Sequence, residues 1–468
     1  MEVNMRFYNT LTKKVEEFKP HRDGEIIFYT CGPTVYHDQH IGNMRNYIGH
    51  DILDKTLRYL GYKVKRIMNI TDVGHLTGDS DYGEDKMVLT AKKENKSVLD
   101  IAAYFTDRFF VDFDLVNNKV PEIVSPATKH IDKYIEITKT LIDKGYAYLS
   151  GGNVYFDTSK LTDYYQLTNH KEDELIVGAR EDVENDPNKR NKTDFVLWFT
   201  KSKFEDQELK WDSPWGMGYP GWHMECTGIS INHGGEYLDI HGGGVDNIFP
   251  HHTNEIAQSE AYLGHKWCNY WFHNEHLLDE SGKMSKSKGA TLTVSLLKEK
   301  GYNPLSFRFM CLNSHYRKQL VFSFSSLNSA DQAYKKLLNK ISLIKDEGIL
   351  DEDAFAFYNN KFISHLEDDL NTANAITLIY DLLKNDLVNG HTKLDLIRSF
   401  DKVLSLDLII DEKQSSNHEE IMALIKARDN AKKRKDYDMA DSIRNDLLAK
   451  GIMLIDTREG TTYKIVGE

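Results

Sequence analysis

The sequence predicts an α/β protein, with a parallel sheet in the first part of the chain and helices in the last part. Residues 25–30 and 63–71 have the apolar composition of buried strands, and a helical pattern at 44–60 separates them, which is the order of a βαβ unit. A third strand-like run, residues 236–240, leads into a histidine and three glycines. From residue 325 onward, apolar residues recur mainly at helical spacing.

The composition is that of a soluble globular protein with several domains. A chain of 468 residues is long enough for several cores, and its 40% apolar and 28% charged content is ordinary. No apolar run approaches a membrane span and the first five residues do not resemble a secretory signal, so we expect no membrane partner and a cytoplasmic location. Four cysteines are too few for a disulfide framework. With a net charge of −13, any nucleic-acid contact must come from local basic patches.

The remaining elements follow from the same periodicities. Residues 6–9 and 15–18 predict a hairpin, and 73–86 predict a mobile loop rich in glycine and aspartate. In the middle of the chain, helices are expected at 97–111 and 127–144, and strands at 153–157, 174–177 and 195–199. Further on, helices are expected at 291–300, 304–313, 325–347, 352–366, 372–387, 393–404, 420–435 and 437–450, strands at 453–456 and 461–466, and a polar linker at 411–419.

The stretch between the first strand and its helix, residues 30–45 (TCGPTVYHDQHIGNMR), carries residues suited to chemistry. It contains Cys31, His40 and Asn43 at the carboxyl end of a strand and beside a helix N-terminus, where phosphates are held well. Thr71 ends the next strand, where the same rule expects ligand contacts. Taken alone, an ordinary loop with an incidental histidine and cysteine is the simpler interpretation.

The second half of the predicted sheet brings further candidates. Residues 221–226 (GWHMEC) precede a helix, and the glycines at 242–244 follow a strand, where the backbone can pack against a flat or charged ligand. Trp222 and Asp246 are then candidates to line a pocket, and His241 is a candidate to orient its occupant. For Trp222, a core tryptophan is an equally good interpretation.

Four residues have the chemistry of a metal site. His251 and Glu255 are four apart at the start of a helix, so they project from one face. Cys31 ends the first strand and Cys226 lies near the fourth, and in a parallel fold both can face one crevice. Two thiolates, an imidazole and a carboxylate are a reasonable Zn²⁺ set. Spacing alone is weak evidence for a metal site, because this spacing also occurs by chance and single buried cysteines are usually packing residues.

Two basic segments are candidates for binding phosphates. Residues 283–287 (KMSKS) lie in a glycine-flanked loop, in which the long side chains of Lys283 and Lys286 can follow charge on a triphosphate. Residues 432–435 (KKRK), beside Tyr437, can hold phosphates and stack a base. The alternatives are a solvated basic loop and a solvated helix face, and runs of charge usually are solvated surface.

Two short segments, HIGN at 40–43 and KMSKS at 283–287, occur together in this sequence, and the motifs around them are specific. HIG followed by a polar residue near the N-terminus, with KMSKS in the second half, is the signature pair of class I aminoacyl-tRNA synthetases. The neighbouring words are CGPTVY at 31–36, NITD at 69–72, GWHMEC at 221–226, DIHGGG at 239–244 and HHTNE at 251–255. In this order, over nearly the whole chain, they closely resemble the cysteinyl-tRNA synthetase family.

The resemblance implies a domain organisation. It implies a Rossmann-like parallel-sheet catalytic domain with an inserted connective domain, then a stem-contact region with the KMSKS loop, an α-helical bundle and a small C-terminal anticodon-binding domain. The expected ranges are 1–111 and 205–275 for the halves of the catalytic domain, 112–204 for the insertion, 276–324 for the stem-contact region, 325–410 for the bundle and 411–468 for the anticodon-binding tail. The insertion is too short for a hydrolytic editing domain.

The resemblance also implies roles for single residues. These are zinc ligands at Cys31, Cys226, His251 and Glu255; catalytic residues at His40, Asn43, Lys283 and Lys286; ATP contacts from His40, Asn43, Gly242, Gly243 and Lys286; cysteine contacts from Thr71, Trp222, His241 and Asp246; and anticodon contacts from Lys432, Tyr437, Asp441 and Asp456. Asn43 stands where the signature has a histidine, so it can donate hydrogen bonds but cannot become cationic. Lys432 and Tyr437 stand where the family more often has arginine and tryptophan.

The implied activity is ligation of L-cysteine to the 3′ end of tRNA(Cys) through a cysteinyl-adenylate. It uses ATP with Mg²⁺ and one zinc ion per chain that selects the thiolate, and the enzyme is expected to be a monomer. Two other functions stay open. A cysteine ligase acting on a small amine shares the active-site words but not this tail. A non-catalytic tRNA-binding paralogue is expected to have lost the signatures or the metal set, and neither is lost here.

Overall fold

The computed structural model describes residues 4–73, 97–168, 186–201, 208–279, 282–283, 291–409, 412–434, 436–449, 452–457 and 460–465. It divides into two compact units, Met1–Leu406 and Asp407–Glu468. Among the described residues there is no helix with the length and apolar character that crossing a bilayer requires.

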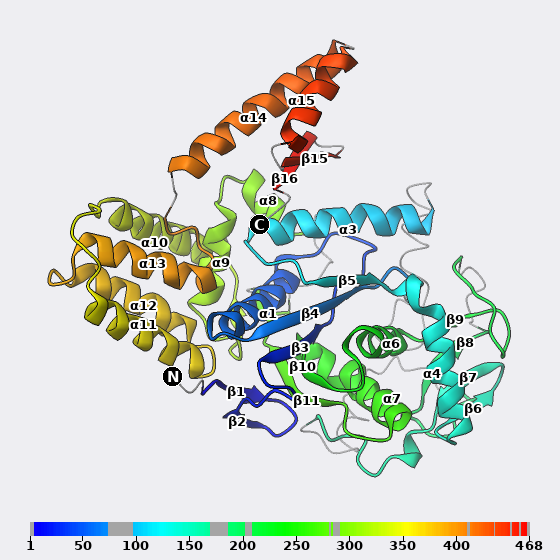
Figure 1. The fold of residues 1–468 in the computed structure, drawn as a ribbon. Coiled ribbons are helices and arrows are strands. Elements are labelled where there is room, and N and C mark those ends of the chain that lie inside the picture. Colours follow the sequence, from blue (N-terminus) through cyan, green and yellow to red (C-terminus); the bar gives the residue numbers. More distant parts are fainter. Residues whose placement is uncertain are drawn as a thin grey trace. The chain divides into compact units, whose positions relative to one another are not determined.

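The centre of the first unit is a five-stranded parallel sheet, which confirms the predicted fold class (Figure 1). Its strands are β3 (Glu25–Thr30), β4 (Lys63–Ile70), β5 (Ile123–Pro126), β10 (Leu238–Gly244) and β11 (Cys268–Asn274), in the spatial order β11-β10-β3-β4-β5. The chain leaves β3 toward β4 on one side and returns to pair β10 with β3 on the other. The switch point, where such sheets bind ligands, therefore lies between the carboxyl ends of β3 and β10.

Both faces of this sheet are covered by helices, which explains why the strands are continuous apolar runs. Ile27, Tyr29 and Cys31 point toward α6 (Trp222–Gly234) and pack with its Met224. Alternate residues face the other way. The ring of Phe28 therefore packs edge-on against the ring of His50 in the helix α1 (Ile41–Tyr59), with ring centroids 6.1 Å apart. The helices α4 (Ile131–Asp143) and α7 (Thr253–Leu263) extend the α6 layer, and α3 (Val98–Leu115) packs against α1.

Smaller sheets surround the central one. The hairpin β1 (Arg6–Asn9) and β2 (Lys14–Glu17) precedes β3. A four-stranded antiparallel sheet consists of β6 (Ala147–Ser150), β7 (Asn153–Phe156), β8 (Phe195–Phe199) and β9 (Tyr219–Pro220). A three-stranded sheet consists of β12 (Leu277–Asp279), β13 (Gly282–Lys283) and β14 (Leu320–Val321). After the four-stranded sheet, the chain returns through α6 to the core strand β10.

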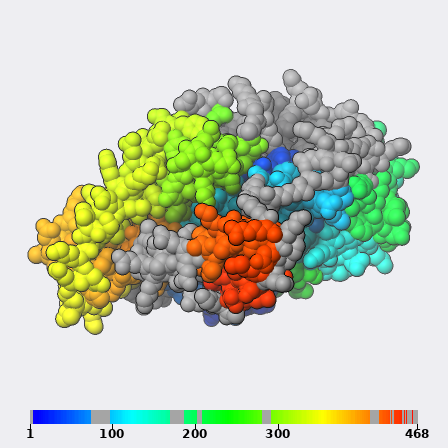
Figure 2. Space-filling view, turned by 90° about the horizontal axis from the view of Figure 1, so that it is seen from above, coloured from blue at the N-terminus to red at the C-terminus, as the bar shows by residue number. Residues whose placement is uncertain are grey.

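Helices make up the rest of the first unit. They are α8 (Val294–Glu299), α9 (Pro304–Leu312), α10 (Phe324–Ser342), α11 (Glu352–Glu367), α12 (Thr372–Lys384) and α13 (Gly390–Leu404). Asn371 caps α12, because its side chain accepts a hydrogen bond from the Asn374 amide at 3.2 Å. Figures 1 and 2 both show the α10–α13 bundle and the antiparallel β6–β9 sheet at opposite ends of this unit.

The second unit contains α14 (Glu412–Lys433), α15 (Tyr437–Ala449) and the antiparallel pair β15 (Ile452–Thr457) and β16 (Gly460–Ile465). Its core consists of Ile421, Ile425, Ile443, Leu447 and Leu454. The linker predicted at 411–419 was wrong, because α14 already begins at Glu412. The segment is polar but contains no proline or glycine, and its Glu, Lys and Gln are good helix formers.

Two boundaries near the site also differ from expectation. The strand β10 runs through Gly244, so the three glycines lie in the strand and not after it. The helix α6 begins at Trp222, so Cys226 lies in the second turn of the helix and not in a loop before it.

The short strands β5, β6 and β9 were missed, and β5 extends the central sheet into the range expected for the insertion. The loop at 74–86 and the strand at 174–177 lie outside the described residues.

Asp369 joins three segments of the first unit. Its backbone has a φ of 54°, its Oδ1 accepts from the Tyr8 amide at 2.9 Å and from the Tyr316 hydroxyl at 2.5 Å, and its Oδ2 accepts from Arg317 Nε at 2.8 Å. The Asp369 amide donates to the Arg6 carbonyl at 3.0 Å. This buried carboxylate therefore ties the N-terminal hairpin and the 315–317 loop to the helical bundle.

We expect Asp369→Asn to lower the free energy of unfolding by about 1.5–3 kcal/mol, because charged hydrogen bonds are replaced by weaker neutral ones. Asparagine tolerates a positive φ, so the turn itself is kept. The matched control is Asp368→Asn at the exposed neighbouring position, which should change stability by no more than about 0.5 kcal/mol. Urea unfolding of both variants measures the difference, and equal effects would contradict the assignment.

Candidate metal and nucleotide site

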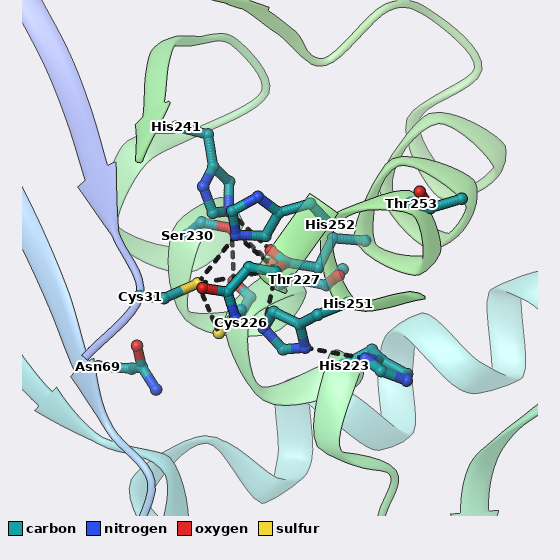
Figure 3. A network of polar contacts seen from close by, with 12 residues as sticks. Cys31, Asn69, His223, Cys226, Thr227, Ser230, His241, His251, His252 and Thr253 are labelled. Atoms are coloured by element: carbon teal, nitrogen blue, oxygen red, sulfur yellow. Dashed lines mark hydrogen bonds and ion pairs between the residues drawn. The ribbon is translucent and has the colours of Figure 1, made fainter. Parts of the chain in front are cut away.

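Four side chains from distant parts of the chain meet at the switch point of the sheet. Cys31 directly follows β3, Cys226 comes from α6, His251 comes from the turn Ile248–His252, and Glu255 comes from the first turn of α7. Their ligand atoms all lie within 4.8 Å of one another, and all four residues are buried. Figure 3 shows Cys31 reaching this cluster from the end of a strand while Cys226 and His251 reach it from helices.

The geometry of this cluster has the dimensions of a tetrahedral metal site. The Cys31 and Cys226 sulfurs are 3.9 Å apart, which is far beyond a disulfide and close to the roughly 3.8 Å separation of two thiolates on one zinc. His251 Nε2 is 3.0 Å from Glu255 Oε1, and Cys31 Sγ is 4.0 Å from the same oxygen. Two soft sulfurs, an imidazole nitrogen and a carboxylate oxygen therefore converge, a donor set that fits Zn²⁺.

The charges of the cluster fit a cation as well. Burial raises the pKa of the Cys31 thiol well above its usual range. For Cys226, burial is outweighed by a hydrogen bond with Cys31 and by the charge of His251, and its pKa falls to about 6. Glu255 is buried too, but the charges of His241 and His251 lower its pKa to about 2. Although burial opposes its charge, Glu255 raises the pKa of His251 to about 10. The negative charge of this buried cluster therefore favours a cation, and a bound metal ion would be one.

A second histidine set lies against the same atoms and was not found from the sequence. His252 Nε2 is 3.2 Å from Cys31 Sγ, and His241 Nε2 is 2.9 Å from Glu255 Oε2, so Cys31, His241, His252 and Glu255 form an alternative ligand group. Successive residues of a regular helix point about 100° apart, so spacing does not bring His251 and His252 together. The wide turn Ile248–His252 before α7 allows both to point inward.

The first group contains both sulfurs, whereas the second contains only Cys31, and soft sulfur donors suit zinc. His251 Nδ1 lies 2.9 Å from His223 Nδ1, so its second ring nitrogen has a partner, as metal-bound histidines usually have. His252 Nδ1 lies 2.8 Å from His273 Nε2, and His241 stacks on Trp271. These contacts hold His252 and His241 as a wall around the cluster. The sequence had singled out His241 beside the glycines, and the histidine pair at 251–252 was the signal for His252.

The residues expected to contact the amino acid lie around this cluster. Trp222 stacks on His251 with ring centroids 4.1 Å apart, and His241 is fully buried beside Glu255. Thr71 accepts a hydrogen bond from Asn69 Nδ2 at 3.0 Å and also bonds to the buried Glu225. Asp246 follows β10 in a short 3₁₀ turn. The structure therefore brings Trp222 and His241 against the cluster and leaves Thr71 and Asp246 at its edges.

The residues expected to contact ATP lie at the start of α1 and at the end of β10. His40 is the N-cap of α1, and its Nδ1 accepts from the Asn43 amide at 3.3 Å. A side chain at Gly242 would press on His50 at 2.8 Å, and one at Gly243 would press on His252 at 2.5 Å. The glycines are therefore required by the protein's own histidines, in addition to any role toward a ligand.

Other predicted residues fall outside this region. Lys283 lies in β13, paired with Leu278, and Lys286 lies outside the described residues. In the second unit, Lys432 is half-buried on α14 and Asp441 is exposed on α15. Tyr437 begins α15, and Asp456 lies in β15 opposite Thr461.

Comparisons with known proteins agree along the whole chain. Residues 17–332 match the family model of the class I (C) tRNA synthetase catalytic domain, and residues 361–408 match the DALR domain. A cysteine–tRNA ligase of Treponema denticola is 44% identical, with 99% of this chain and 100% of that protein covered. A cysteine–tRNA ligase of Borrelia garinii is also 44% identical, with 98% and 99% covered.

Solved structures show the same fold at low identity. The methionyl-tRNA synthetase of Mycobacterium tuberculosis, in complex with methionyl-adenylate, superposes with a TM-score of 0.54 at 14% identity. The match covers 82% of this chain and 91% of that one. This likeness supports the architecture of the chain and not its substrate.

Proposed function

The chain belongs to the cysteine–tRNA ligases, which are class I aminoacyl-tRNA synthetases, and we propose that it joins L-cysteine to the 3′ end of tRNA(Cys) through a cysteinyl-adenylate. The observation that carries the details of the site is the buried cluster of Cys31, Cys226, His251 and Glu255 at the switch point of the sheet. A site with two soft donors at this point suits an amino acid that is distinguished by its sulfur.

Zinc is the metal that this cluster fits best. Cys31, Cys226, His251 and Glu255 would hold the ion, which supplies a Lewis acid to which a substrate thiolate binds far better than a hydroxyl does. His223 and His241 orient His251 and Glu255 through hydrogen bonds. Trp222, which stacks on His251, gives the site an aromatic wall.

Activation requires the amino acid to be held in line with the α-phosphate of ATP. We assign His40, Asn43 and the N-terminus of α1 to the phosphates, since amide groups and the helix dipole favour anions there. Lys286 and Lys283 are assigned to the charge that develops on the leaving pyrophosphate, with Mg²⁺ accompanying ATP. The carboxylate of cysteine attacks the α-phosphate and pyrophosphate leaves. The terminal ribose hydroxyl of the tRNA then attacks the adenylate carbonyl and releases AMP.

The second unit distinguishes this function from ligation to a small amine. The relatives named as cysteine–tRNA ligases align over 99% of the chain, which includes Asp407–Glu468. Lys432, Tyr437, Asp441 and Asp456 in this unit are our candidates for contacts to the anticodon. An enzyme that modifies a small amine has no use for such a unit.

The setting of the enzyme is proposed from weaker observations. All four cysteines are free and buried, as expected for a protein of the reducing cytoplasm. A monomeric state follows from the resemblance, and light scattering on the purified protein measures it.

A chain shortened to residues 1–409 tests the function. It keeps the whole first unit, so we expect cysteine-dependent ATP–pyrophosphate exchange at nearly the full-length rate. Charging of a tRNA transcript with the anticodon GCA should fall on the order of tenfold or more, because contacts that read single-stranded bases have been removed. The control is the full-length chain in both assays. Equal charging by the two proteins would contradict the assignment of the second unit to the anticodon, and exchange without tRNA charging by the full-length chain would favour ligation to a small amine.

A further inference from the structure

Arg45 is an almost fully buried arginine on α1, two residues after Asn43. Its Nη1 donates to the Glu275 carbonyl at 3.0 Å and to the His276 carbonyl. Its Nη2 donates to the Lys318 carbonyl at 2.5 Å and to the His315 carbonyl at 3.4 Å. The planar, forked guanidinium therefore joins the first helix to two chain segments that are more than 200 residues away. A lysine has a single nitrogen and cannot make the same set of hydrogen bonds.

The two segments that Arg45 holds are the starts of two paired strands. His276 directly precedes β12, and Lys318 shortly precedes β14, which pairs with β12 in parallel. The strand β12 also pairs with β13, which ends at Lys283, the first residue of the KMSKS motif. Arg45 thus lies at the base of the small sheet that carries the chain into the second signature, while its own helix begins with the first.

Other contacts make this junction a defined one. The amide of Ile41, in the first turn of α1, donates to the carbonyl of Leu292 at 2.8 Å, on the far side of the KMSKS segment. Close to Arg45, a side chain at Gly49 would lie 1.9 Å from Asn274 Oδ1, so α1 approaches the end of β11 closely at this one point. A small cavity lined by Ile48, Cys311 and other residues opens next to Arg45. Since packing is incomplete there, the four hydrogen bonds matter more for the position of the helix.

We propose that Arg45 is a positioning residue for adenylate formation, one that fixes the helix bearing His40 and Asn43 against the strands that lead into Lys283. This rests on the proposed function, in which the two signatures act on one ATP molecule. A displacement of about 1 Å between groups that hold one substrate is enough to cost up to 10²-fold in rate. Burial lowers the pKa of the Arg45 guanidinium, but an arginine stays protonated in a protein.

The test compares Arg45→Lys with a matched control, Arg308→Lys. Arg308 is equally buried and also joins α1 to other segments, through Asp51 Oδ2 (2.6 Å) and the carbonyls of Leu404 (2.7 Å) and Val116 (2.9 Å), but its bonds do not reach the strands of the small sheet. For Arg45→Lys we expect kcat of cysteine-dependent exchange to fall about 10- to 50-fold, with the KM for cysteine within about twofold and zinc content unchanged. For Arg308→Lys we expect a lower Tm but a kcat within about twofold.

A second readout does not depend on activity. Hydrogen exchange should become faster in Arg45→Lys at the Leu320 and Phe322 amides, which bond to the carbonyls of His276 and Leu278, and not in α13. Unchanged protection of these amides in Arg45→Lys, or equal losses of kcat in the two variants, would overturn the proposal. An inactive parent protein would refute the proposed function instead, and the hydrogen-exchange comparison would still decide the role of Arg45.

Discussion

Replacing Cys226 with serine is expected to remove the bound zinc and to slow cysteine activation by at least about 100-fold. Loss of a ligand should exceed the roughly 10- to 100-fold cost of losing a partner in the outer shell of a metal site. A hydroxyl is a harder and weaker ligand than a thiolate, and Cys31 would be the one sulfur left in the group. His251→Ala removes another donor of the same group and should behave alike. Elemental analysis gives the zinc per chain, and ATP–pyrophosphate exchange gives the rate.

The matched control is Cys268→Ser. Cys268 is also buried in the first unit, but its sulfur lies near the Tyr270 carbonyl, away from the cluster. This variant should keep about one zinc per chain and a rate within about twofold of the parent. If His252→Ala loses the zinc and Cys226→Ser keeps it, the alternative group with His241 and His252 is the metal site.

Serine is the informative competitor for the parent enzyme. Serine and cysteine have nearly the same shape, and a purely steric pocket rejects an isostere only by about 10- to 200-fold. Selection through a metal–sulfur bond gives much larger discrimination and makes an editing domain unnecessary. A metal-free parent protein that prefers cysteine over serine by several orders of magnitude would refute the zinc assignment.

Replacing Lys286 with alanine is expected to lower the rate of adenylate formation by about two orders of magnitude. One preorganised charge donor toward a developing anion is usually worth that much. The KM for cysteine should change by less than about twofold, because we propose that the metal cluster, and not this lysine, holds the amino acid. Exchange kinetics at varied ATP and cysteine concentrations separate the two effects.

The control for this prediction is Lys288→Ala, which removes the same charge from the same segment but outside the motif. It should keep most of the activity. An Lys286→Ala variant with the parent rate would mean that the segment is only a solvated basic loop, which is the alternative that the sequence left open.

The sequence by itself determined the α/β class and most of the elements. The strand at 25–30 and the end of the helical pattern at 44–60 follow from local rules: β3 has the predicted bounds, and α1 ends at Tyr59, one residue before the predicted end. The four-residue spacing of His251 and Glu255 predicted that their side chains would meet, and they lie 3.0 Å apart, although His251 belongs to the turn before α7. Local rules failed where signals were weak, as in the polar segment 412–419, which continues a helix.

Only the tertiary structure decided which distant groups meet. Cys31 and Cys226 are 195 positions apart, and no periodicity relates them; the parallel order of β3 and β10 and the packing of α6 bring their sulfurs together. The same holds for His252, which a wide turn directs at Cys31, and for Arg45, whose partners lie at the starts of β12 and β14. Residue types and local spacing can be read from the sequence. Contacts between residues far apart in the sequence form only after the sheet has fixed the positions of its strand ends.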